Sequence, residues 1–214
     1  MKRITLVSFA FSALVFLLTI PYSPYPGSLL VKALPILILL GVAWVSLQGS
    51  TRLLMSAALL LSACGDVFLE MNLFTPGLGS FLVAQLCYAW YFFSQRGSGS
   101  LPYGRLLLIV AIMLAVSLPV VSHAGELFVP VAIYMTAIAL MGLAAALYRK
   151  PSTLLFVGAL LFVASDSMIG INRFVTPLPG AKYAIMITYY AAQLLILWGV
   201  MRTVVTSSGT EEHT

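Results

Sequence analysis

The sequence predicts an all-α integral membrane protein, a helical bundle with about eight transmembrane helices. Of its 214 residues, 61% are apolar and only 8% are charged, and the mean hydropathy is +1.06. A soluble domain carries about a quarter charged residues, because these residues cover its surface. Lipid must therefore be the solvent for most of this surface. The apolar runs are long and lack a two-residue alternation, which excludes a membrane β-barrel.

Eight apolar runs, separated by Pro/Gly clusters or isolated charges, have roughly the 17–25 residues that cross a bilayer as a helix. They cover residues 4–20, 29–47, 52–70, 77–95, 104–121, 126–148, 152–171 and 180–204. The first run follows Lys2-Arg3 as in a signal peptide, but no small-x-small cleavage pattern ends it. We therefore expect one membrane domain over 1–205 and a polar tail at 206–214.

The Lys and Arg residues predict the orientation of the helices. With the N-terminus inside, eight of them flank the inner ends of the spans and three flank the outer ends. The inner residues are Lys2, Arg3, Arg52, Arg96, Arg105, Arg149, Lys150 and Arg202, and the outer ones are Lys32, Arg173 and Lys182. This bias predicts cytoplasmic termini, in what we expect to be a bacterial inner membrane. The charges form no basic stripe, so nucleic acid is not an expected partner.

A short pattern occurs twice in the chain. Asp-x5-Asn-x-Phe begins at Asp66 and again at Asp166, 100 residues later, and a Thr-Pro pair follows each copy. Both copies close a span that runs from inside to outside. The chain could therefore consist of two parallel four-helix repeats, 1–103 and 104–205, with a site between them.

The two intramembrane aspartates are the candidate catalytic residues. Asp66 lies fourteen residues beyond Arg52, and Asp166 sixteen beyond Lys150. At about 1.5 Å per residue, both lie roughly 20–25 Å from the inner surface, in the outer half of the membrane. An Asp at mid-span costs roughly 2.5–3.5 kcal/mol on insertion scales and usually faces the bundle interior. The alternative is a structural role, in which each Asp hydrogen-bonds a neighbouring helix.

Other polar residues gather near the same depth and are candidate substrate-binding residues. They are Lys32, Glu70, Asn72, Gln85, Tyr88, Asn172, Lys182, Tyr189, Tyr190 and Gln193. Lys32 lies inside its span, so we expect it to meet an aspartate or a lipid phosphate. For Lys182 and Arg173 the alternative is that their ammonium and guanidinium groups extend to the interface.

The sequence lacks the residue patterns of several common kinds of catalytic site. The two histidines, His123 and His213, lie in a short loop and in the tail, and there is no H-E-x-x-H or Cys/His cluster for zinc. No G-x-S-x-G elbow, P-loop or dinucleotide motif is present. The sequence therefore predicts neither metal nor cofactor, and leaves carboxylate acid/base chemistry, ion or proton transport, or a structural role.

Several motifs, taken in order, resemble the YhhN-like (transmembrane lysoplasmalogenase) family. They are Lys32-Ala33-Leu34-Pro35, Ser62-Ala63-Cys64-Gly65-Asp66, Phe81-x6-Tyr88, the run 158–166 that ends Ala-Ser-Asp, and Tyr189-x3-Gln193-Leu194-Leu195. The resemblance extends from about Lys32 to Gly199. One departure is Gln85, because relatives commonly carry His there. We expect Gln85 to make a polar contact with the substrate rather than to transfer a proton.

The resemblance implies hydrolysis of the vinyl ether bond of lysoplasmalogens, which releases a fatty aldehyde and glycerophosphoethanolamine or glycerophosphocholine. Burial disfavours a charged carboxyl group, and a nearby carboxylate disfavours it further. One of Asp66 and Asp166 could thus remain protonated as the acid while the other is ionised. Lys32, with Lys182 or Arg173, would hold the lysolipid phosphate. The competing hypothesis is a proton-coupled transporter or lipid carrier that uses the same Asp pair.

Overall fold

The protein is a bundle of long helices. The computed structural model describes residues 2–97, 99–148 and 153–211, with side chains described as far as Val204. The described part contains α1 (Arg3–Thr19), α2 (Ser28–Ser46), α3 (Gly49–Glu70), α4 (Phe74–Ser94), α5 (Tyr103–Ser122), α6 (Phe128–Ala146), α7 (Thr153–Gly170) and α8 (Ala181–Glu211). Short 3-10 turns occupy Ile20–Tyr22 and Gly125–Leu127, and a π-helical turn, Ile171–Val175, follows α7. Arg149 and Lys150, two of the predicted inner charges, lie outside the described residues.

These helices match the predicted spans to within a few residues, and the protein is an integral membrane protein. Seven of them are long and apolar enough to cross a membrane, and the described helix that falls short is α4. Helix α4 still has 21 residues, enough for about 30 Å. Its apolar character is reduced by Pro76, Gly77, Gly79 and Gln85. Helix α8 continues to Glu211, past the end predicted for the last span.

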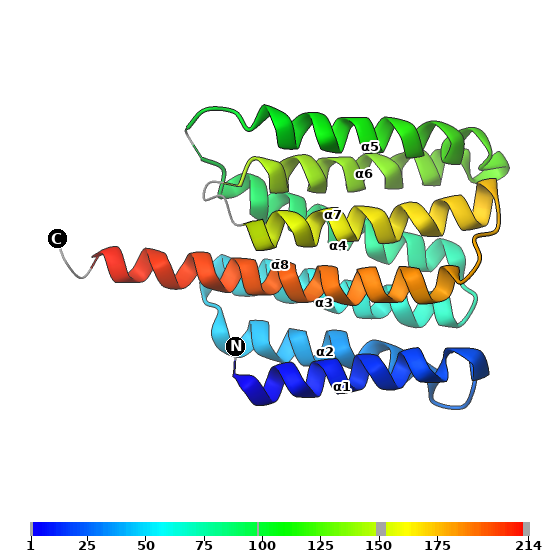
Figure 1. Ribbon diagram of the computed structural model, residues 1–214, viewed down its shortest axis with the longest axis horizontal. Coiled ribbons are helices and arrows are strands. Elements are labelled where there is room, and N and C mark those ends of the chain that lie inside the picture. The colour runs from blue at the N-terminus through cyan, green and yellow to red at the C-terminus, as the bar shows by residue number, and fades with distance from the viewer. Residues whose placement is uncertain (1, 98, 149–152, 212–214) are drawn as a thin grey trace.

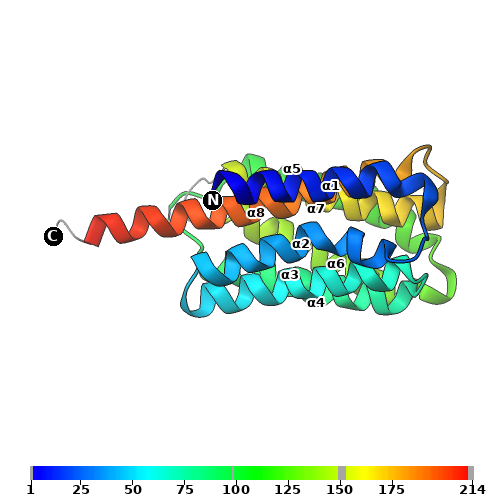
Figure 2. The ribbon, with the colours of Figure 1, turned by 90° about the horizontal axis from the view of Figure 1, so that it is seen from below.

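The helices form two layers. Helices α1, α8, α7 and α5 lie in one layer and α2, α3, α4 and α6 in the other (Figure 2). Successive helices run in opposite directions, so the N-terminus and the end of α8 lie at the same end of the bundle (Figure 1). This arrangement agrees with an even number of spans.

Six helices repeat one pattern of contacts. Helix α2 packs on α3 and α3 on α4, as α6 packs on α7 and α7 on α8. Helix α4 also packs on α6 of the other half, as α8 packs on α2. The first helix of each half departs from the pattern, because α1 contacts α8 whereas α5 contacts α7. At the end of the bundle, Phe74 and Phe174 meet edge to face with ring centroids 5.8 Å apart. The two phenylalanines occupy the same place in the repeated sequence pattern.

Helices α7 and α8 approach closely through two glycines. A Cβ added at Gly158 would lie 2.8 Å from Ile196 N, and one added at Gly199 would lie 2.8 Å from Leu155 N. Small residues at such an interface allow helix backbones to pack in a membrane, where no hydrophobic force drives them together. This close approach places Asp166 and Tyr189, on the two helices, on the same side of the bundle interior.

The variant Gly158→Ala should therefore destabilise the bundle. The new methyl group meets backbone atoms of α8, so the free energy of unfolding should fall by about 1–3 kcal/mol. The melting temperature of the purified protein in detergent measures this loss. Gly41→Ala is the matched control, because no atom lies within 4 Å of a Cβ at Gly41 and alanine is the better helix former. Equal melting temperatures for the two variants would contradict the prediction.

Candidate functional site

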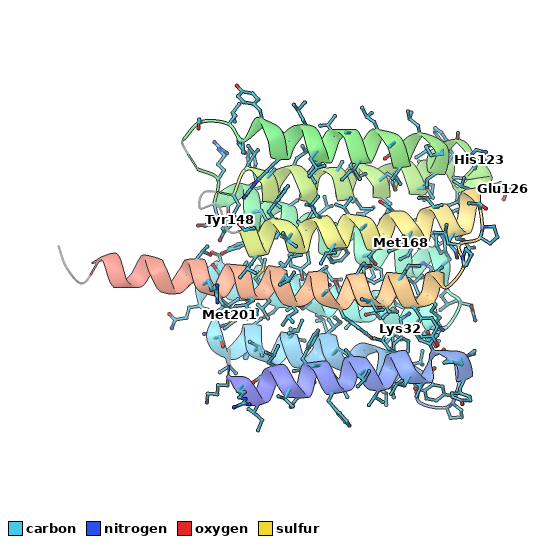
Figure 3. All side chains as sticks on the ribbon, in the orientation of Figure 1. Lys32, His123, Glu126, Tyr148, Met168 and Met201 are labelled. Carbon is cyan, nitrogen blue, oxygen red and sulfur yellow. The ribbon has the colours of Figure 1, made fainter. Side chains whose placement is uncertain are left out.

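A cavity of about 260 Å³ lies inside the bundle, toward the end opposite the two termini. Figure 3 marks Lys32 near this end and Tyr148 near the other. Six residues that the sequence singled out line the cavity, namely Lys32, Asp66, Asp166, Asn172, Lys182 and Tyr189. The remaining wall consists of Leu69, Phe81, Ser165, Ile169, Ala181, Ile185 and Met186. The two aspartates predicted at matched depth thus face one common space.

Asp66 lies on α3, one turn before the helix ends, and is buried. Its Oδ2 accepts a hydrogen bond of 2.8 Å from the Tyr189 hydroxyl on α8. Its Oδ1 lies 4.0 Å from the Lys32 ammonium on α2. A buried carboxylate needs such partners, because an uncompensated charge in a low-dielectric interior is costly. Asp66 thus has one hydrogen-bond donor and one cation.

Asp166 occupies the corresponding place on α7 and is also buried. Its Oδ2 accepts two hydrogen bonds of 2.8 Å each, from Gln85 Nε2 on α4 and from the Tyr134 hydroxyl on α6. Both donors are uncharged. Gln85 does not line the cavity, so its polar contact is with Asp166 rather than with the cavity space. Tyr134, a single tyrosine in an apolar run, was not among the residues predicted for the site.

The partners of the two aspartates follow the repeated pattern of helices. Each aspartate contacts one residue on the second helix of its own half, Lys32 for Asp66 and Tyr134 for Asp166. Each also accepts a hydrogen bond from the fourth helix of the other half, from Tyr189 or from Gln85. The sequence contained a signal for Tyr134, since it lies 32 residues before Asp166 as Lys32 lies 34 before Asp66.

A charged cluster lies at the end of the cavity nearest the loops that join α1 to α2 and α7 to α8. Glu70 is buried and its carboxylate lies 3.5 Å from the Lys32 ammonium and 3.6 Å from that of Lys182. The Ser23 hydroxyl, in the turn between α1 and α2, donates a hydrogen bond to Glu70 and accepts one of 2.9 Å from Lys182. The Lys182 side chain is 44% exposed, so this cation faces both the cavity and the outside. Ser23 was not among the residues predicted for the site.

Buried aromatic rings lie below the cavity, on the side of the termini. Tyr189 packs edge to face on Phe81 and on Phe162, and Phe162 in turn packs on Tyr88. The Tyr88 hydroxyl donates a hydrogen bond of 2.6 Å to Gln193 Oε1. Tyr88 and Gln193 do not line the cavity and belong to this packed layer. Tyr190 also lies outside the lining, and its hydroxyl donates to the backbone carbonyl of Lys32.

Three predicted polar residues lie at the surface near the loops. Asn72 is exposed and outside the cavity lining, and its φ of +60° places it in the left-handed conformation that a turn requires. Asn172 lines the cavity, and its Oδ1 accepts a hydrogen bond of 2.8 Å from the Leu178 amide. The Arg173 guanidinium lies 4.0 Å from the centroid of the Phe74 ring, a cation–π contact. Among the described residues, no three His, Cys, Asp or Glu side chains gather where they could hold a metal ion.

Comparison with known proteins gives a family match over residues 27–200, to the YhhN family. Lysoplasmalogenase TMEM86B of Homo sapiens is 39% identical over 180 residues, which are 81% of this chain and 75% of that protein. A lysoplasmalogenase of Mycobacterium bovis is 37% identical over 160 residues, 71% of this chain and 61% of that protein. Lysoplasmalogenase TMEM86A of Bos taurus is 32% identical over 210 residues, 88% of this chain and 84% of that protein.

The matched region begins before Lys32 and ends after Gly199, so it contains every motif on which the predicted resemblance depended. No solved structure matches this chain. Because the family match covers nearly the whole bundle and the relatives are 32–39% identical, the chain belongs to the YhhN family.

Proposed function

We propose that this protein is a lysoplasmalogenase, which hydrolyses the vinyl ether bond of lysoplasmalogens within the membrane. The products are a fatty aldehyde and glycerophosphoethanolamine or glycerophosphocholine. The observation that carries the proposal is the pair of buried carboxyl groups, Asp66 and Asp166, which face one cavity. The names of the family relatives support the substrate class.

Vinyl ether hydrolysis needs the groups that this cavity contains. The reaction begins with protonation of the alkene carbon, which produces an oxocarbenium ion that water then captures. It requires a general acid, an anion to stabilise the cation, and a base for the water. Two carboxyl groups in different environments can divide these roles, as in other pairs of catalytic carboxyl groups. Asp66 and Asp166 are two such groups, because their partners differ.

The phosphate of the lysolipid binds at the charged end of the cavity. Lys182 is the half-exposed cation there and Lys32 the buried one, and ammonium groups bind phosphate as point charges. A cavity of about 260 Å³ is smaller than the roughly 300–1,000 Å³ of pockets that enclose a drug-sized ligand. The cavity therefore receives the glycerol and the vinyl ether, while most of the hydrocarbon chain lies outside it in apolar surroundings.

A transporter that uses the same aspartates needs a path from this cavity to the opposite face. On the side of the cavity where such a path would run lie the buried, contacting rings of Phe81, Tyr189, Phe162 and Tyr88. The cavity lining lies in the half of the bundle away from the termini. This geometry favours a hydrolase over a transporter.

Purified protein should release a long-chain aldehyde from a lysoplasmalogen and none from the saturated ether analogue, because only the vinyl ether can be protonated at carbon. Asp66→Asn and Asp166→Asn should each lower kcat by at least about 100-fold, as loss of a general acid or base does. Coupled oxidation of the aldehyde measures the rate.

Glu126→Gln is the control for these two variants. Glu126 is an exposed carboxylate in the loop before α6, at the same end of the bundle (Figure 3), and its removal should leave the rate unchanged. Size-exclusion profiles and melting temperatures establish that each variant is folded. Full activity in either Asp variant would refute the scheme with two carboxyl groups.

Lys182→Gln should raise KM for lysoplasmalogen about tenfold with little change in kcat, since a charged hydrogen bond to the phosphate contributes about 1.5–3 kcal/mol. Arg173→Gln is the matched control, because the Arg173 guanidinium stacks on Phe74. Initial rates over a range of substrate concentrations in detergent micelles separate the two constants. A larger rise in KM for Arg173→Gln than for Lys182→Gln would assign the phosphate to Arg173.

We propose further that both termini face the cytoplasm of a bacterial cell. Four arginines, Arg3, Arg52, Arg96 and Arg105, lie near the end of the bundle that carries the termini, where the positive-inside rule requires them. A fluorescent protein fused to the C-terminus should therefore fluoresce, and alkaline phosphatase fused there should be inactive. The reverse pair of results would invert the orientation.

A further inference from the structure

The two aspartates occupy equivalent positions but have different partners. Asp66 lies near a cation, the Lys32 ammonium, and accepts one hydrogen bond from Tyr189. Within the described part of the chain, Asp166 accepts hydrogen bonds only from the uncharged groups of Gln85 and Tyr134. Among the described residues no Lys, Arg or His nitrogen lies within 4.0 Å of its carboxyl oxygens.

This difference bears on which carboxyl group is ionised. A charge buried away from water is costly unless an opposite charge compensates it. Lys32 compensates Asp66, whereas Asp166 faces Asp66 itself across the cavity, and a nearby carboxylate disfavours a second negative charge. One negative and one neutral carboxyl group is the arrangement that these contacts favour, with the charge on Asp66.

The groups around Asp166 on the neighbouring helices are consistent with a neutral form. They are Lys32 on α2, Asp66 on α3, Gln85 on α4, Tyr134 on α6, and Tyr189 and Lys182 on α8. The Lys32 ammonium lies by Asp66 and Glu70. The Lys182 ammonium is engaged by Ser23 and Glu70. On α5, the Arg105 guanidinium lies over the Phe156 ring, near the other end of the bundle. Among the described side chains of these helices, no cation lies within 4.0 Å of the Asp166 carboxyl group.

The hydrogen bonds also indicate which oxygen of Asp166 carries the proton. Both donors, Gln85 Nε2 and the Tyr134 hydroxyl, reach the same atom, Oδ2. An oxygen that accepts two hydrogen bonds is the carbonyl-like one in a neutral carboxyl group, which leaves Oδ1 for the proton. Oδ1 makes no hydrogen bond to the residues that the structure describes, and Asp166 lines the cavity.

We propose that Asp166 is the general acid, that Asp66 is the carboxylate that stabilises the oxocarbenium ion and takes the proton from water, and that Tyr134 and Gln85 are positioning residues for Asp166. This assignment rests on the proposed function, and it deepens that function by giving each aspartate one role. Tyr134 and Gln85 act through Asp166, because they hold Oδ2 and so direct Oδ1 toward the substrate.

The proposed reaction needs no reactant besides the lysolipid and one water molecule. The Oδ1 proton of Asp166 passes to the alkene carbon next to the ether carbon, the π bond breaks, and the ether carbon becomes an oxocarbenium ion opposite Asp66. Water adds to that carbon and gives a proton to Asp66, so that the substrate becomes a hemiacetal. As the bond between carbon and glycerol oxygen breaks, Asp66 returns its proton to that oxygen. The hemiacetal hydroxyl gives its proton to Asp166, and both groups are restored.

A stable cation that resembles the intermediate tests the assignment by binding rather than by turnover. The probe is a lysophosphoethanolamine analogue with a saturated chain, in which a secondary amine, protonated at neutral pH, replaces the ether oxygen. The Lys32 ammonium is shared by Asp66, at 4.0 Å, and Glu70, at 3.5 Å, so the Asp66 carboxylate still attracts a second cation. Calorimetry should show binding weakened at least about tenfold in Asp66→Asn and at most about threefold in Asp166→Asn. The opposite order would overturn the assignment.

A matched pair of tyrosine variants provides a second measurement if an Asp variant does not fold. Tyr134→Phe and Tyr189→Phe each remove one hydroxyl that donates a hydrogen bond of 2.8 Å to one aspartate. Loss of the Tyr134 hydroxyl should slow proton transfer to carbon, so the solvent deuterium isotope effect on kcat should be larger in Tyr134→Phe than in Tyr189→Phe. An equal or larger effect in Tyr189→Phe would overturn the assignment.

Tyr148→Phe is the control for both tyrosine variants. Its hydroxyl is hydrogen-bonded to Thr203 at the other end of the bundle, so the rate and the isotope effect should match those of the unmodified protein. Failure of the proposed function is distinguishable, since the unmodified protein would then release no aldehyde. If aldehyde is released and the amine probe discriminates as described, both the function and the assignment stand.

Discussion

Two carboxyl groups buried in an apolar bundle are the constraint on which the rest of this structure depends. Each must receive hydrogen bonds or a cation inside the protein, because lipid supplies neither. The donors and the cation come from α2, α4, α6 and α8, while the carboxyl groups lie on α3 and α7. The need to supply hydrogen bonds or a cation to Asp66 and Asp166 therefore constrains how six helices pack. Helices α1 and α5 supply none of these partners and can pack differently.

Much of this arrangement could be predicted from the sequence, because it follows from composition and spacing. The spans could be predicted from the hydrophobic runs, and the common depth of Asp66 and Asp166 from their distances to Arg52 and Lys150. Residues with neutral side chains were harder to predict. Tyr134 is chemically unremarkable in an apolar run, and only its contact with Asp166 gives it a role. Asn72 resembles Asn172 in sequence, yet a turn with positive φ accounts for it.

The matching contacts of six helices surround the two aspartates with different side chains. The same helices present partners to each aspartate, but Lys32 in one half corresponds to Tyr134 in the other, and Tyr189 to Gln85. Two copies with identical partners would give two carboxyl groups with the same tendency to ionise. Different partners on a shared framework place the two carboxyl groups in different surroundings, and the proposed division of acid and base roles rests on that difference. The chemistry proposed for the pair thus depends on the residues around the aspartates as well as on the aspartates themselves.

Neither half of the chain contains a complete site. Asp66 takes its hydrogen bond from α8, and Asp166 takes one from α4, so each half provides a donor for the carboxyl group of the other. The cavity also has walls from both halves, and Glu70 joins the turn before α2 to the start of α8 through Ser23 and Lys182. An isolated half would leave its carboxyl group with one partner in a low-dielectric interior, at a cost of several kcal/mol. The packing of these six helices and the formation of the site therefore depend on each other.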